Sequence, residues 1–273
     1  MYKIFDLHND YYLKLNSDGK KDKYLSKNKQ VAENIISAVW TSELSCTESI
    51  DVIERARDYI NSRNNVFLAV EDMHFLNKDN FDKLLSLNPI YVGLTWNTTN
   101  CLAGGVNECG RLTNFGKQVV KTLDSSNIKI DTAHLNEDSF MDLAKIASKP
   151  LFCSHTAFFG LNSHGRNLKD YQIKMIIDSG GIVGLCLVSD FLTGNSKCDV
   201  RDIVSHIDYF ACKFGINNLA LGTDFYGTNH LPKGVSNYSN LTSKLSKALK
   251  NLGYTEKSIE KIFYNNASNF FAV

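Results

Sequence analysis

Side chains that commonly bind metal ions recur along this chain, and each ends a short apolar run or follows it directly. His8 and Asp10 stand two residues apart, and Glu71, His134 and His155 each stand at the end of a further run. Neutral imidazole and carboxylate form a nitrogen and oxygen set that suits zinc, while manganese, cobalt or iron could also occupy it. One such residue alone is more often a capping or core polar group. Their joint occurrence predicts a metal site.

The spacing of these residues suggests how they would share the ions. Successive side chains of a β-strand point to opposite faces, so His8 and Asp10 would face the same side and grip one ion. Glu71 could span two ions with its two carboxylate oxygens. His134 and His155 would supply nitrogen ligands to the second ion. A further carboxylate, Asp224, ends the last apolar run.

Eight short apolar runs could carry and position these side chains. Amphipathic stretches separate them, an alternation typical of βα units around a parallel sheet. Eight repeats within 273 residues favour a closed (β/α)8 barrel over an open doubly wound sheet. In such a barrel the site lies at the carboxyl ends of the strands. The predicted strands span residues 3–8, 34–40, 66–70, 90–95, 128–133, 151–154, 182–187 and 219–222.

Helical periods fill most of the intervals between the strands. Tyr11–Gln30, polar and rich in lysine, is instead interpreted as a long first loop that partly covers the site. The sequence contains no Pro-rich or Ser-rich linker, so residues 1–273 are predicted to form a single domain. The predicted helices span residues 51–61, 113–126, 136–148, 169–179, 200–214, 236–252 and 255–263.

The charge and cysteine content of the chain indicate which kinds of binding partner and metal site to expect. Thirty Lys and Arg balance 29 Asp and Glu, and no long basic block occurs, so neither nucleic acid nor a membrane surface is an expected partner. A small molecule is expected instead. The seven cysteines include no C-x-x-C pair, which disfavours a thiolate zinc site and a disulfide framework. The amino terminus has no secretory signal pattern, and a cytoplasmic location is expected.

The motifs around these residues resemble those of the membrane dipeptidase (renal dipeptidase) family of metallopeptidases, which has a barrel of the metallo-dependent hydrolase type. The resemblance covers nearly the whole chain. Asp6–Asp10 is similar to the first-strand motif of that family, and His164–Asn167 is similar to its substrate-binding Arg-Asn segment. The other matching segments are 69–72, 112–120, 130–134, 152–156 and 221–225.

The resemblance implies a role for each matching residue. His8 and Asp10 would bind one zinc, Glu71 would bridge two, and His134 and His155 would bind the second. A hydroxide between the ions would attack the amide bond of a dipeptide, with Asp224 as general base and then general acid. Arg166 and Asn167 would bind the substrate, with the Arg166 guanidinium on its terminal carboxylate. A homodimer is expected by analogy with the family.

Two positions depart from the family pattern. Trp96 stands where some members have a histidine that contacts the substrate carbonyl, so Trp96 is expected to alter substrate contact and range. Tyr226 follows Asp224-Phe225 where many members have Asp. Two alternatives stay open. One is another amidohydrolase-like enzyme acting on cyclic amides, lactones or amines. The other is a metal-binding barrel with impaired catalysis, although the complete ligand set argues against it.

Overall fold

The computed structural model describes residues 2–18, 32–195 and 197–273. Contacts within the chain divide it into two compact units. The first unit comprises Met1–Ile35 and Cys153–Val273, and the second unit comprises Ile36–Phe152. Each unit contains parallel strands with helices between them.

The first unit is built on parallel strands in the order β1 (Ile4–Asn9), β8 (Leu219–Leu221), β7 (Val183–Leu185) and β6 (Cys153–Thr156). Every residue of these strands is buried. Burial on both faces suits the apolar residues of β7 and β8, whereas β1 and β6 also bury polar side chains. The carboxyl ends of these strands lie at one edge, so the polar residues that end β1, β6 and β8 gather there.

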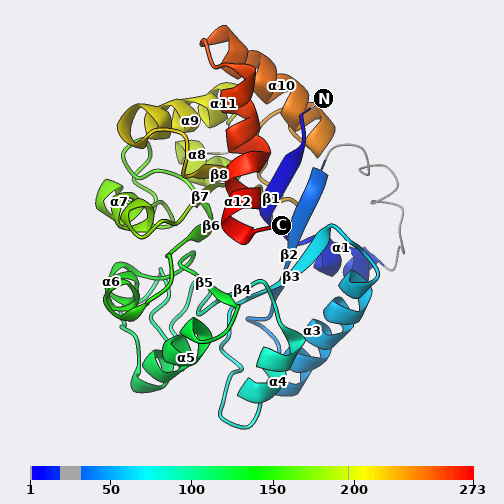
Figure 1. Ribbon diagram of the computed structural model, residues 1–273, viewed down its shortest axis with the longest axis vertical. Helices are drawn as coiled ribbons and strands as arrows, with labels where there is room; N and C mark the ends of the chain where they lie inside the picture. Colours follow the sequence, from blue (N-terminus) through cyan, green and yellow to red (C-terminus); the bar gives the residue numbers. More distant parts are fainter. Residues whose placement is uncertain (1, 19–31, 196) are drawn as a thin grey trace. The chain divides into compact units, whose positions relative to one another are not determined.

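Helices surround the strands of the first unit. The helix α9 begins after Asp199, whose side chain accepts a hydrogen bond from the Arg201 backbone N–H, and α10 is capped in the same manner by Asn237. The π-helical turn η1 and α12 lie beside β1 and β8 (Figure 1). The helices of this unit are α1 (Tyr11–Asp18), α7 (Asp170–Asp178), α8 (Ser189–Thr193), α9 (Val200–Phe214), α10 (Tyr238–Asn251), α11 (Glu256–Glu260), η1 (Lys261–Asn265) and α12 (Asn266–Phe271).

The second unit has its strands in the order β2 (Ala32–Trp40), β3 (Val66–Glu71), β4 (Tyr91–Gly93) and β5 (Lys129–Asp131). The first residues of β2 belong to the first unit. A capping box between Ser45 and Glu48 starts α3, and the Asn136 side chain caps α6. The helices are α3 (Cys46–Asn61), α4 (Phe81–Leu87), α5 (Asn114–Asp124) and α6 (Glu137–Ile146).

A strand lies in each of the eight predicted runs, but one predicted loop is wrong in part. Residues Tyr11–Asp18 form helix α1, because the Asn9 side chain accepts from the Tyr11 N–H and Tyr11 and Tyr12 bury their rings. Residues 19–30 of that predicted loop lie outside the described residues. The short helices α4, α8 and α12 were not predicted. Within the described ranges, no helix combines the length and apolar character that crossing a membrane requires.

Candidate metal centre

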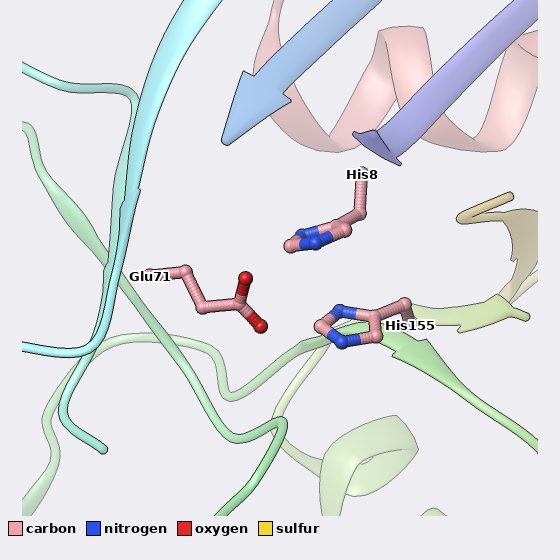
Figure 2. A group of neighbouring side chains, drawn as sticks. All are labelled: His8, Glu71 and His155. Atoms are coloured by element: carbon pink, nitrogen blue, oxygen red, sulfur yellow. The ribbon is translucent and has the colours of Figure 1, made fainter. Parts of the chain in front are cut away.

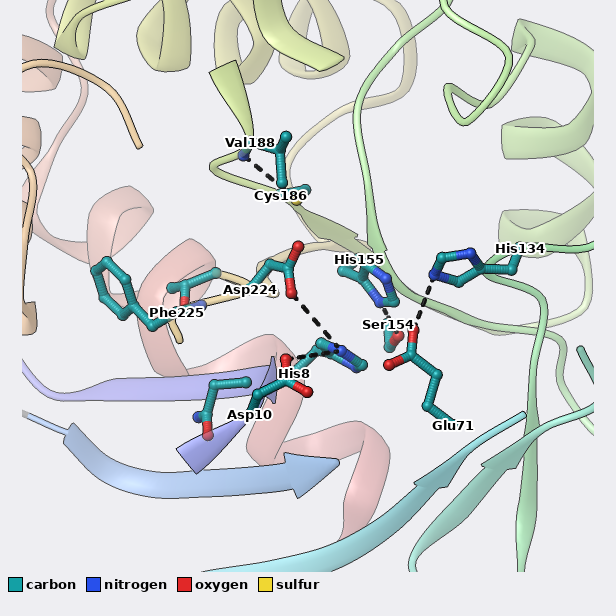
Figure 3. A network of polar contacts seen from close by, with 12 residues as sticks. His8, Asp10, Glu71, His134, Ser154, His155, Cys186, Val188, Asp224 and Phe225 are labelled. Carbon is teal, nitrogen blue, oxygen red and sulfur yellow. Dashed lines mark hydrogen bonds and ion pairs between the residues drawn. The ribbon is translucent and has the colours of Figure 1, made fainter. Parts of the chain in front are cut away.

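Three acidic and imidazole side chains meet at the carboxyl ends of β1 and β8. His8 Nε2 lies 4.0 Å from Asp10 Oδ2 and 3.9 Å from Asp224 Oδ1 (Figure 3). Ligand atoms of these three residues all lie within 4.8 Å of one another. The alternation along β1 that predicted a shared face for His8 and Asp10 is confirmed, and the structure adds Asp224 to this group.

A second histidine of the first unit lies against His8. Figure 2 shows the imidazoles of His8 and His155 against each other. They stack with ring centroids 3.8 Å apart and an interplanar angle of 28°. The hydroxyl of Ser154 lies 2.7 Å from His155 Nδ1, a contact that orients the imidazole ring. We call His8, Asp10, His155 and Asp224 the β1/β8 half-site.

Burial controls the charge state of this half-site. Burial, with the charge of Arg166 as the second cause, lowers the pKa of His8 to about 3, so its ring is neutral. Burial raises the pKa of Asp224 to about 7, against the opposing effect of Arg166. Burial and then the neighbouring Asp224 carboxylate raise the pKa of Asp10 well above its ordinary value. Without a cation, burial therefore favours the protonated form of both carboxyl groups.

A divalent cation fits these residues. Nitrogen and oxygen ligands about 2.1 Å from one ion lie roughly 3–4 Å apart, as the ligand atoms of His8, Asp10 and Asp224 do. Those separations are too long for hydrogen bonds. Metal binding requires a neutral imidazole, which His8 provides, and a bound cation stabilises ionised carboxylates.

The backbone after β8 adopts an unusual path that presents Asp224. The φ angle of Asp224 is 58° and that of Tyr226 is 72°, both in the left-handed region that non-glycine residues seldom occupy. The Asp224 N–H donates to the His8 carbonyl at 3.0 Å, which ties this turn to β1. A Cβ on Gly227 would collide with the carboxylates of Asp10 and Asp224, so only glycine allows this close approach.

Arg166 lies in the same unit with its guanidinium only partly used. One Nη donates to the His155 carbonyl at 3.2 Å, and the guanidinium carbon lies 5.4 Å from the centre of the Phe191 ring. Its Nε is buried, and nothing in the described part of the chain accepts a hydrogen bond from it. The neighbouring Asn167 donates to the carbonyls of Asn162 and Phe191. Arg166 is thus a buried cation with donor capacity for an anion.

The second unit carries a different arrangement at the ends of β3 and β5. His134 Nε2 lies 2.8 Å from Glu71 Oε1 (Figure 3). His134 Nδ1 lies 2.8 Å from Asn97 Oδ1. Because an amide oxygen only accepts hydrogen bonds, this contact favours a proton on Nδ1, while Nε2 is directed at Glu71. His134 has a φ angle of 67°. We call Glu71, His134 and Asn97 the β3/β5 half-site.

Aromatic rings flank the β3/β5 half-site. Trp96 packs edge to face on Trp40 with centroids 5.3 Å apart, and its ring lies 6.0 Å from that of His134. Trp96 is partly exposed. The second unit thus presents an apolar wall beside its imidazole.

The predicted site residues therefore form two groups, each brought together within its own unit. Sequence reasoning missed three residues that support them: Asn97, Ser154 and Trp40. Trp40 ends a predicted strand, a position that could have drawn attention to it. The first unit contains His8, Asp10, His155, Arg166, Asn167 and Asp224, and the second unit contains Glu71, Trp96 and His134.

Comparison with known proteins identifies relatives of this chain. A model of the membrane dipeptidase family (peptidase family M19) matches residues 22–271. An uncharacterized protein in the pqqA 5′ region of Klebsiella pneumoniae is 33% identical over 187 residues, which cover 64% of this chain and 68% of that protein. An uncharacterized dipeptidase of Schizosaccharomyces pombe is 26% identical over 238 residues, covering 81% of this chain and 57% of the relative.

Solved structures confirm the predicted fold class. A metallo peptidase from Rhodobacter sphaeroides, liganded with a phosphinate mimic of the dipeptide L-Ala-D-Ala, matches with a TM-score of 0.86 at 20% identity. The match covers 100% of this chain and 99% of that structure. The fold is the (β/α)8 barrel of metallo-dependent hydrolases, as the eight strand–helix repeats predicted.

Proposed function

We propose a function on the basis of family membership: this chain belongs to the membrane dipeptidase family, peptidase family M19. The proposed function is hydrolysis of the peptide bond of dipeptides in a metal-dependent reaction. The observation that carries the proposal is the β1/β8 half-site, where a neutral imidazole, a buried carboxyl group and a partly buried one lie near a buried arginine. The name of the Schizosaccharomyces pombe relative and the dipeptide mimic in the Rhodobacter sphaeroides structure support the same substrate class.

Two zinc ions are the proposed cofactors. In a (β/α)8 barrel the carboxyl ends of all strands open on one face, so the fold class supports a joint role for the two half-sites. His8 and Asp10 would hold one ion, Glu71 would be shared, and His134 and His155 would hold the second. When bound, the ions acidify water and polarise the scissile carbonyl.

Asp224 is the proposed general base and acid. Its carboxylate would take a proton from the attacking water as the new carbon–oxygen bond forms. It would then return that proton to the amine nitrogen as the carbon–nitrogen bond breaks. The products are two free amino acids, and no oxidant or reductant is needed.

Arg166 is the proposed ligand for the terminal carboxylate of the substrate. Its buried Nε and the remaining N–H groups of the guanidinium could form a bidentate pair with two carboxylate oxygens. Such a pair would restrict the substrate to very short peptides. Asn167 would line the same end of the substrate, and Trp96 would contact a substrate side chain.

A dipeptide panel tests this function. We expect the purified protein to cleave dipeptides, to lose activity on chelation and to recover it when zinc is added back. The panel includes D-residues at the carboxyl side, amidated dipeptides, cyclic amides and lactones. Cleavage of cyclic substrates without dipeptides would overturn the proposal in favour of another amidohydrolase-like activity. Metal binding without turnover on any substrate would indicate a barrel that has lost catalysis.

A further inference from the structure

A buried carboxylate lies one layer below the β1/β8 half-site. Asp6 is completely buried, and its Oδ2 accepts from the Tyr238 hydroxyl at 2.5 Å, the Thr223 hydroxyl at 2.6 Å and the Asn9 amide at 3.1 Å. Its Oδ1 accepts from the backbone N–H groups of Thr223 at 2.8 Å and His8 at 3.3 Å. Five donors therefore surround one carboxylate, and no lysine or arginine pairs with it in the described ranges.

These bonds join the segments that carry the candidate metal ligands. Asp6 and His8 alternate along β1 and share a face, and Asp10 follows directly after the strand. The residue after Thr223 is Asp224, so the bonds from Thr223 to Asp6 anchor the turn on which Asp224 stands. Tyr238, the first residue of α10, closes the network from a third element and also accepts from the Asn9 amide.

A carboxylate suits this position better than an amide would. Each oxygen of Asp6 accepts at least two hydrogen bonds. An asparagine has one accepting oxygen, and its NH₂ group would face donors wherever it turned. Every buried donor left without an acceptor is costly, so the surrounding strand ends would have to shift.

We propose that Asp6 is a positioning residue that sets the spacing of His8, Asp10 and Asp224 for metal binding and turnover. The proposal rests on the proposed function for its catalytic part, because the positioned groups are the proposed ligands and acid–base group. Its role toward the metal is measurable separately. Because five donors occupy its carboxylate, Asp6 would act through its partners, chiefly Thr223 and Tyr238.

Three substitutions test the network without removing a candidate ligand. Asp6→Asn reverses hydrogen-bonding polarity, Thr223→Val removes one donor at constant shape, and Tyr238→Phe removes another. Thr223→Ser retains the hydroxyl and serves as the conservative rescue. Tyr254→Phe is the matched control, since Tyr254 donates to Asp208 at 3.0 Å and belongs to neither half-site nor the Asp6 network.

Each variant is loaded with Co²⁺, and its visible spectrum, metal affinity, kcat, KM and melting temperature are measured. We expect Asp6→Asn, Thr223→Val and Tyr238→Phe to lower metal affinity or kcat by about 10- to 100-fold and to alter the Co²⁺ spectrum. KM should stay within about twofold, because the Arg166 segment is untouched. Thr223→Ser and Tyr254→Phe should behave as wild type.

Lower melting temperatures with an unchanged Co²⁺ spectrum and unchanged kcat would overturn the proposal, because they indicate a purely structural network. Should Asp6→Asn fail to fold, the Thr223→Val and Thr223→Ser pair still decides the question. If no dipeptide is cleaved, the proposed function fails. In that case the Co²⁺ spectra and metal affinities alone test whether Asp6 positions the candidate metal ligands.

Discussion

The two half-sites differ in how their buried polar and ionisable side chains are stabilised. In the β3/β5 half-site, His134 lies between Glu71 and Asn97, so a protein oxygen lies 2.8 Å from each ring nitrogen. In the β1/β8 half-site, His8 is neutral while burial raises the pKa of Asp10 and Asp224. The imidazole of the β3/β5 half-site thus contacts protein groups on both sides, whereas a bound cation would stabilise the ionised carboxylates of the β1/β8 half-site. The pH dependence of the metal-free protein should therefore arise mainly in the β1/β8 half-site.

The most severe test of this contrast is Asp224→Asn. We expect kcat for dipeptides to fall by about 10²- to 10⁴-fold, because the group that moves the proton is removed. Metal analysis of the same protein distinguishes two roles for Asp224. Two retained ions with lost turnover support acid–base catalysis, whereas loss of one ion together with activity would make Asp224 a ligand.

Arg166→Ala should have the next largest effect. We expect KM for free dipeptides to rise by about 100-fold, since hydrogen bonds to charged groups contribute about 1.5–3 kcal/mol each. Amidated dipeptides, which lack the terminal carboxylate, serve as matched substrates and should lose little. Equal losses on both substrates would contradict a carboxylate-binding role.

The two half-sites can be compared by removing the side chain that contacts one histidine in each: Asn97 beside His134 and Ser154 beside His155. Asn97→Ala should weaken metal binding by about tenfold, because the Asn97 oxygen fixes which nitrogen of His134 is protonated. Ser154→Ala should weaken it less, because the Ser154 hydroxyl can donate or accept and does not fix the proton of His155. Calorimetric titration with zinc measures both, and a greater loss for Ser154→Ala would reverse this ranking.

The smallest expected effect is on how the free energy of unfolding of the metal-free protein depends on pH. Burial raises the pKa of Asp224 from the ordinary 3.8 to about 7. Between these values the unfolded chain releases a proton that the folded chain keeps, so stability from this group is complete below pH 3.8 and is lost as pH rises toward 7. We expect a loss of at least about 1 kcal/mol. Urea unfolding with and without Asp224→Asn measures it, and identical pH profiles would contradict the shift.

The sequence predicted which side chains share a strand face, because that follows from strand periodicity. It did not predict contacts between residues that lie far apart in the chain. His8 and Asp10 were predictable as neighbours because they share one strand face. Asp6 has partners 217 and 232 residues away in the chain, and no local pattern indicates such pairs. The same limit explains Asn97, which lies 37 residues from His134. Helices as short as α4 offer too few turns for a clear apolar period.

The left-handed backbone at His134 and Asp224 has a consequence for engineering. Both residues occupy conformations that glycine adopts freely and that cost other side chains energy. A selection for heat tolerance alone could therefore favour glycine at either position and discard the imidazole or the carboxylate. Directed evolution of this barrel would need selection for activity at every round, because thermal stability and catalytic activity favour different residues at these two positions.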